Sequence, residues 1–313
     1  MALSGIDAIT FGVADMGEAK RFLDDWGVTP VALTPDRLVY QTKDGGELIV
    51  RPKDAPDLPG AIEPGNTVRE VIWGADSEDD LRATLAGLGP ATTGADGLPR
   101  VVDPNGLSLG FRVTRRRKVE VAPTPVNGPG VPQRIDRRSP VHDHAEPVQI
   151  GHIVLFAGDF AAMRAFYTER VGLIVSDEYP NHGVFLRCQT RGEHHNLFVL
   201  NRPGKPGVNH VAFTVSDIHE VIGGGLAMAR KGWKTEIGPG RHPISSAYFW
   251  YFENPLGAPI EYYADDDYCT ENWRPGVFER KPELFAEWAI AGGIDGLTRR
   301  QVAAVDRSGR GHA

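Results

Sequence analysis

Short apolar stretches alternate with amphipathic segments along most of this 313-residue chain. Residues 6–28 and 150–173 each begin with an apolar run of strand length, pass an Asp in a turn, and continue with apolar positions at helical spacing. The same succession returns in residues 69–89 and 209–232. The pattern predicts strand–helix units that alternate with further strands.

The two halves of the chain align as an internal duplication. The equivalent positions are Ala8 and His152, Asp15 and Asp159, Phe22 and Phe166, Glu70 and His210, and Gly110 and Glu261. Each repeat is expected to hold two βαβββ modules, with helices on the convex face of a curved mixed sheet. The predicted fold class is therefore α+β, with two tandem domains of the same architecture.

Residues 113–146 separate the repeats and are rich in Pro, Arg and Gly without a sustained apolar period, which predicts a linker. After the second repeat, the apolar residues of the segment "KPELFAEWAIAGG" fall on one helical face. We expect this helix to cover the mouth of a barrel or a subunit interface. The predicted organisation is an N-terminal domain over 1–112, a linker over 113–147, a C-terminal domain over 148–268 and a helical tail over 269–313.

Charge and composition narrow the class of partner. The net charge of −7 and the isoelectric point near 5.8 argue against nucleic acid or an acidic membrane surface, since both need a basic face. The two cysteines, Cys188 and Cys269, form no disulfide framework, as is typical of a reducing cytosol. No run of eighteen apolar residues occurs anywhere in the sequence, and the N-terminus shows no positively charged segment ahead of an apolar stretch. We expect a cytoplasmic protein with a small-molecule partner.

Histidine is distributed unevenly. All ten histidines follow residue 141, so the first repeat contains none. Histidine is the commonest metal ligand and a frequent general acid or base. The chemistry of the protein is therefore predicted in the second half.

Three polar residues interrupt the apolar strands predicted in that half: His152, His210 and Glu261. The alignment places them opposite Ala8, Glu70 and Gly110 of the first repeat. Each alone is compatible with a packed histidine or an ion-paired acid. Together, two neutral imidazoles and one carboxylate around a divalent cation would satisfy one another, and they are the ligand set of non-haem Fe(II) oxygen chemistry. The first repeat has Ala8 and Gly110 at two of these places, so only the second repeat is expected to hold a transition metal.

The second half also resembles a known family. The matching segments are "GHIVL" at 151, "HHNLFVL" at 194, "GVNHVAFTV" at 207, "GRHP" at 240 and "YFENPLGAPIEYY" at 251. They are similar to the catalytic domain of type I extradiol catechol dioxygenases, such as catechol 2,3-dioxygenase and dihydroxybiphenyl dioxygenase, in the vicinal oxygen chelate superfamily. The resemblance covers residues 148–266 as the active domain and 5–112 as a degenerate domain without metal.

The resemblance implies an enzyme that uses Fe(II), or Mn(II) in its place, held by His152, His210 and Glu261. Such an enzyme inserts both atoms of O2 into a catechol beside the diol, giving a muconic semialdehyde in aromatic catabolism. It also implies a homo-oligomer. No membrane and no nucleic acid partner is expected.

The resemblance further implies three catalytic residues around the metal. His195 would be the acid and base for the substrate proton, a role suited to imidazole near neutrality. His242 and Tyr251 would hydrogen-bond the substrate oxygens. His194 precedes His195, and strand alternation turns only one of the two toward the site. We expect it to be His195, which aligns with Leu197 and Val199.

Two other functions compete with the dioxygenase. A glyoxalase-type metal isomerase or lyase would draw ligands from both repeats, which Ala8 and Gly110 disfavour. A non-enzymatic small-molecule binding protein, of the kind that sequesters drugs, would need no metal triad.

Overall fold

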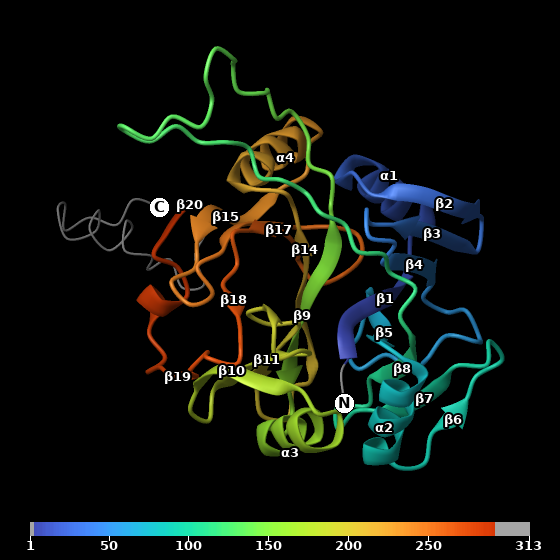
Figure 1. Cartoon of the computed structure of the whole chain (residues 1–313). Coiled ribbons are helices and arrows are strands. Elements are labelled where there is room, and N and C mark those ends of the chain that lie inside the picture. The colour runs from blue at the N-terminus through green and yellow to red at the C-terminus, as the bar shows by residue number, and fades with distance from the viewer. Residues whose placement is uncertain (1–2, 292–313) are drawn as a thin grey trace, which may run out of the picture.

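The computed structural model describes residues 3–291, which form two large mixed sheets of eight and ten strands (Figure 1). The first repeat contains β1 (Leu3–Val13), α1 (Met16–Trp26), β2 (Thr29–Thr34), β3 (Arg37–Gln41), β4 (Glu47–Pro52), β5 (Thr67–Ala75), α2 (Glu78–Leu88), β6 (Thr92–Thr93), β7 (Pro99–Val102) and β8 (Ser108–Val113). The second contains β9 (Gln149–Ala157), α3 (Phe160–Ala165) with a π-helical turn (Phe166–Arg170), β10 (Ile174–Tyr179), β11 (Gly183–Arg187), β12 (Gly192–Glu193), β13 (Leu197–Asn201), β14 (Gly207–Thr214), α4 (Ile218–Arg230), β15 (Thr235–Arg241), β16 (Tyr248–Phe252) and β17 (Ile260–Ala264). The chain continues through β18 (Tyr268–Cys269), β19 (Gly276–Val277), a 3-10 turn (Pro282–Leu284) and β20 (Trp288–Ala291).

The two sheets share one strand order. The first runs β2-β3-β4-β1-β5-β8-β7-β6, and the second repeats it as β10-β11-β13-β9-β14-β17-β16-β15, with β19 and β20 added at its edges. In the first sheet, Ile72 on β5 pairs with Ala8 on one side and with Gly110 on the other. In the second sheet, Ala212 on β14 pairs in the same way with His152 and Glu261. The predicted fold class, with two βαβββ modules in each repeat, is confirmed.

The first helix of each repeat begins at the Asp that the alignment paired. The Asp15 carboxylate accepts a hydrogen bond from the Glu18 main-chain N–H, and the Asp159 carboxylate accepts one from that of Ala162. Both satisfy a donor that the first helical turn leaves free. Gly27 ends α1 with φ at 89°, a left-handed conformation that glycine adopts without steric cost.

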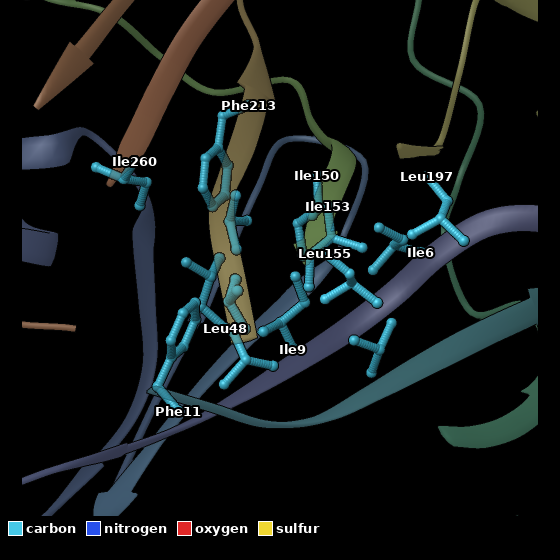
Figure 2. Close-up of a cluster of buried hydrophobic side chains, with 14 of the residues drawn as sticks. Ile6, Ile9, Phe11, Leu48, Ile150, Ile153, Leu155, Leu197, Phe213 and Ile260 are labelled. Atoms are coloured by element: carbon cyan, nitrogen blue, oxygen red, sulfur yellow. The ribbon is translucent and has the colours of Figure 1, made fainter. Parts of the chain in front are cut away.

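One hydrophobic core joins the two repeats, because β1 and β9 lie side by side and their neighbours pack together. Figure 2 shows part of this cluster, with side chains from both sheets pointing toward one another. Its labelled members are Ile6, Ile9, Phe11 and Leu48 from the first repeat and Ile150, Ile153, Leu155, Leu197, Phe213 and Ile260 from the second. The repeat without histidines therefore supports the strands that carry the candidate site.

Trp26 at the end of α1 makes a close contact between the repeats. Its indole stacks on the Tyr262 ring with centroids 3.6 Å apart and planes 9° apart. The Tyr262 hydroxyl donates to the Trp26 carbonyl oxygen at 2.6 Å, and neither side chain reaches solvent. Because Tyr262 follows Glu261 on β17, this contact also holds the strand of one candidate ligand.

Trp26→Ala is expected to lower the free energy of unfolding by about 3–5 kcal/mol, the range for removing a buried tryptophan that leaves a cavity. Urea unfolding followed by circular dichroism measures it, with Trp26→Phe as the milder control. A loss below about 1 kcal/mol would contradict a central role for this contact.

The tail differs from its prediction. No α-helix occurs between residues 269 and 291; Leu284 ends a single 3-10 turn, and Trp288 begins β20, which pairs antiparallel with β15. The open edge of β15 offers unpaired backbone groups, and pairing with them outweighs the local helical pattern. The rest of the predicted helical tail, residues 292–313, lies outside the described part of the chain.

The segment between the sheets is largely irregular from residue 114 to 148, apart from one bridge between Gly128 and Val131. Figure 1 shows its middle, in green, extending away from both sheets. Among the helices in residues 3–291, none has the length and apolar character needed to span a membrane.

Candidate active site

Three neighbouring strands of the second sheet bring His152, His210 and Glu261 together. His152 lies on β9, His210 on β14 and Glu261 on β17, and all three are buried. The two Nε2 atoms are 3.2 Å apart, and the Glu261 Oε2 atom lies 3.4 Å from the Nε2 of His152 and 3.3 Å from that of His210. Three donor atoms thus form a nearly equilateral triangle.

The donor set fits a divalent metal ion. The Glu261 Oε2 atom is buried and has no hydrogen-bond partner among the described residues, which is costly for a carboxylate. Atoms that share an ion at ordinary coordination distances of about 2 Å stand roughly 3 Å apart, as these do. Two imidazoles and one carboxylate on one side of an ion are the ligand arrangement of non-haem iron sites.

The protonation states also suit metal binding. Burial lowers the pKa of His152 to about 4, so its imidazole is neutral near pH 7. Burial raises the pKa of Glu261, but the close approach of the His152, His210 and His242 imidazoles outweighs burial and holds that pKa well below the usual range. The second ring nitrogen of His210 contacts the side-chain oxygen of Asn209 at 2.6 Å, which fixes its tautomer.

His195 stands beside the triangle, with its ring centroid 4.1 Å from that of His152. It lines the cavity described below, and burial lowers its pKa well below the ordinary value. The neighbouring His194 is fully buried, lines no part of that cavity, and contacts Asp177 instead. Of these two neighbouring histidines, the structure brings His195 to the cavity.

His242 and Tyr251 form a hydrogen-bonded pair on the other side. The Nδ1 atom of His242 lies 2.6 Å from the Phe285 carbonyl oxygen, so it must carry a proton and donate. The His242 Nε2 atom then accepts the Tyr251 hydroxyl hydrogen at 3.1 Å. Tyr251 is held on β16 opposite Glu261, and burial keeps its pKa well above 10.

All six predicted residues line one cavity of about 540 Å³. Its walls also include residues that the sequence did not single out, from β10, β11, β13, the loops that follow β10 and β15, and the tail. These are Tyr179, His182, Phe185, Phe198, Leu200, Ile244, Leu284 and Phe285. Val154 lines the wall as expected, but of residues 248–252 only Tyr251 does. Trp250 and Phe252 point into the core on the opposite face of the sheet, and the Phe249 ring stacks on that of His242.

Known proteins resemble this chain in sequence and in fold. Residues 149–262 match the Glyoxalase/Bleomycin resistance protein/Dioxygenase superfamily. The chain is 27% identical over 314 residues to metapyrocatechase 2 of Cupriavidus necator, covering 92% of this chain and 89% of that protein.

Solved structures share the whole fold. A Mn(II)-bound glyoxalase from Novosphingobium aromaticivorans superposes with a TM-score of 0.75 at 25% identity, covering 95% of each chain. A halotolerant catechol dioxygenase superposes with a TM-score of 0.70 at 19% identity, covering 93% of this chain and 95% of that one. The family resemblance seen in the sequence is thereby confirmed. In residues 149–262, this chain carries a domain of the Glyoxalase/Bleomycin resistance protein/Dioxygenase superfamily, within a two-sheet fold shared with extradiol catechol dioxygenases.

Proposed function

We propose that the protein is an Fe(II)-dependent extradiol dioxygenase that cleaves a catechol beside its diol. One observation carries this proposal: the donor triangle of His152, His210 and Glu261 lines the same largely aromatic cavity as three further polar side chains. These are His195, His242 and Tyr251. The relationship to metapyrocatechase 2 along most of the chain supports it. Mn(II) suits the same donor atoms, so the ligand set does not select iron over manganese.

The metal would be held by His152, His210 and Glu261, and when bound it supplies free coordination positions and the redox chemistry that oxygen activation requires. The chain itself seats the substrate. Phe185 and Phe198 stack with centroids 3.8 Å apart and offer an apolar wall to an aromatic ring. This wall excludes water and leaves the diol as the polar end that faces the triangle.

His195 is the residue placed to take a proton from the diol. Its imidazole lines the cavity next to His152, and because burial lowers its pKa well below the ordinary value, the ring is neutral near pH 7. A neutral imidazole accepts the hydroxyl proton when the diol binds and returns it later in the reaction. The same side chain therefore serves as base and then as acid.

The Tyr251–His242 pair orients the substrate. Because the Tyr251 hydroxyl donates to His242, the lone pairs of its oxygen remain free to accept a hydrogen bond. A diol hydroxyl that keeps its proton can donate to this oxygen. The pair thus favours binding of a singly deprotonated diol, with one proton taken by His195 and one retained beside Tyr251.

A glyoxalase-type isomerase is the second candidate, since one structural neighbour is a Mn(II)-bound glyoxalase. A site shared between repeats would need ligands on the first sheet. There Ala8 and Gly110 offer no donor side chain, and Glu70 is engaged with Arg100 at 2.7 Å. The candidate ligands all lie in the second repeat, which favours the dioxygenase. A binding protein without metal would leave the Glu261 oxygen buried and unpaired.

Oxygen uptake distinguishes these functions. Protein purified without air and loaded with Fe(II) is mixed with a series of catechols, while an oxygen electrode and visible absorbance are followed together. The proposal predicts oxygen consumption equal to catechol consumed, with a yellow ring-fission product. Turnover of a hemithioacetal without oxygen uptake would instead support the isomerase, and the absence of bound metal would support the binding protein.

The size of the cavity predicts a substituted catechol as the preferred substrate. A volume of about 540 Å³ is typical of sites for drug-sized ligands and exceeds what a single ring fills. A catechol with a phenyl or alkyl group that contacts Phe198 is expected to have kcat/KM roughly tenfold or more above that of catechol. Phe198→Ala should reduce this preference. Equal kcat/KM values in the unaltered enzyme would contradict the prediction.

A further inference from the structure

A chain of buried polar side chains lies behind His195, outside the cavity. The Asp177 Oδ2 atom is 2.8 Å from the His194 Nε2 atom, and the His194 Nδ1 atom is 3.1 Å from the His195 Nδ1 atom. All three side chains are buried, with exposures of 4% for Asp177, none for His194 and 5% for His195. We propose that Asp177 and His194 act as positioning residues that fix the tautomer of His195, and this inference rests on the proposed function.

The direction of each hydrogen bond follows from the acceptor at its end. Asp177 is held in place because its Oδ1 atom accepts the Gly276 main-chain N–H at 2.6 Å. An ionised carboxylate only accepts, so the His194 Nε2 atom must carry the proton and donate. A neutral His194 then presents a bare Nδ1 atom, which accepts from the Nδ1–H of His195.

The consequence appears at the other side of the His195 ring. With its proton on Nδ1, neutral His195 has a lone pair on Nε2, which is the form that can take a proton from a diol. The reversed tautomer would present an N–H at that position and could not act as the base. The relay therefore selects the reactive tautomer before the substrate binds, as the buried carboxylate of a catalytic triad does.

The surroundings keep the relay free of competing partners. Trp273 approaches the His194 ring edge-on with centroids 5.6 Å apart, and Phe185 approaches both His194 and His195 at 5.3 and 5.2 Å. These aromatic rings limit access of water to the imidazoles. The Asp266 carboxylate contacts His194 only through its main-chain N–H, at 3.0 Å, among the hydrogen bonds of the described residues.

The same atoms offer an alternative, because His194, His195 and Asp266 are close enough to hold a second metal ion. Two observations favour the relay. The two Nδ1 atoms stand at hydrogen-bond distance from each other, and the His194 ring is already engaged by Asp177 on its far side. The experiment must nevertheless distinguish a hydrogen bond from a shared ion.

Nitrogen-15 NMR of histidine-labelled, zinc-loaded full-length protein reads the tautomers directly, and metal analysis counts the ions. The relay predicts one zinc per chain, a protonated His194 Nε2 atom, a protonated His195 Nδ1 atom and a bare His195 Nε2 atom. Two zinc ions per chain, or a proton on the His195 Nε2 atom, would overturn it. This readout needs no activity and no variant, so it stands apart from the fate of the proposed function.

Asp177→Asn tests the consequence for turnover. The side-chain oxygen of the new asparagine keeps the Gly276 hydrogen bond, so its NH2 group faces the His194 Nε2 atom. Because an NH2 group only donates, the protons move to His194 Nδ1 and His195 Nε2, and both tautomers are reversed. In the iron-loaded enzyme we expect kcat to fall about 10²-fold or more, with KM within about threefold of the unaltered value and metal content unchanged.

Asp266→Asn is the matched control, because it changes a neighbouring half-buried carboxylate that contacts His194 only through the main-chain N–H of that residue. It should retain kcat and the tautomers of the unaltered protein. The relay is contradicted if the NMR signals of Asp177→Asn keep the original tautomers, or if both variants lose kcat equally.

Discussion

Glu261→Ala is expected to yield folded protein that binds no iron and has lost at least about 10³-fold of its activity. The carboxylate contributes the only negative charge of the donor triangle, and its Oε2 atom lies within 3.4 Å of both imidazole nitrogens. Without it, His152 and His210 offer two neutral donors, too few to retain a divalent ion against solvent. Metal analysis after gel filtration and oxygen uptake with a catechol measure the two losses.

Glu253→Ala provides the control for that change. Glu253 is exposed, its carboxylate lies 3.7 Å from the Lys234 ammonium, and it does not line the cavity that contains the triangle. This variant should keep its iron and its activity. Iron retained at full occupancy in Glu261→Ala would remove Glu261 from the ligand set.

His195→Gln is expected to separate metal binding from turnover. The side chain lines the cavity beside His152 but is not one of the three metal donors. The iron content should therefore match that of the unaltered protein. Loss of the proton acceptor should lower kcat by about 10²–10⁴-fold, the range for a general acid or base. Glutamine keeps polarity and similar size, which limits structural effects.

Its control is His144→Gln, a change at an exposed histidine of the linker that pairs with Asp143. That variant should turn over normally. An empty metal site in His195→Gln would show instead that His195 is a ligand, and unchanged kcat would show that another group moves the proton.

The donor triangle could be predicted because its members break the pattern of their strands. His152, His210 and Glu261 are polar residues on apolar strands, and the duplication supplied an internal comparison in Ala8 and Gly110. In the structure both repeats pair their strands in the same order, so positions that the duplication made equivalent occupy equivalent places in the two sheets. Signals that are local or repeated in the sequence are the ones that can be interpreted without a structure.

The cavity wall and the relay behind His195 could not be predicted in this way. Asp177, on β10, reaches His194 through the pairing of β10, β11 and β13, and no spacing in the sequence encodes that meeting. The tail was misjudged for a related reason. Its apolar residues satisfied a helical period, yet Trp288 joined the edge of β15, and Phe285 turned toward the cavity, because a neighbouring sheet offered partners.

The most direct test of the account is a single turnover of the iron-loaded enzyme with a catechol and ¹⁸O2. The product is trapped at once with borohydride, which prevents exchange of its aldehyde oxygen with water, and its mass and carbon skeleton are determined. The account predicts two ¹⁸O atoms in a ring opened beside the diol. An opening between the two hydroxylated carbons, or a product without ¹⁸O, would contradict it.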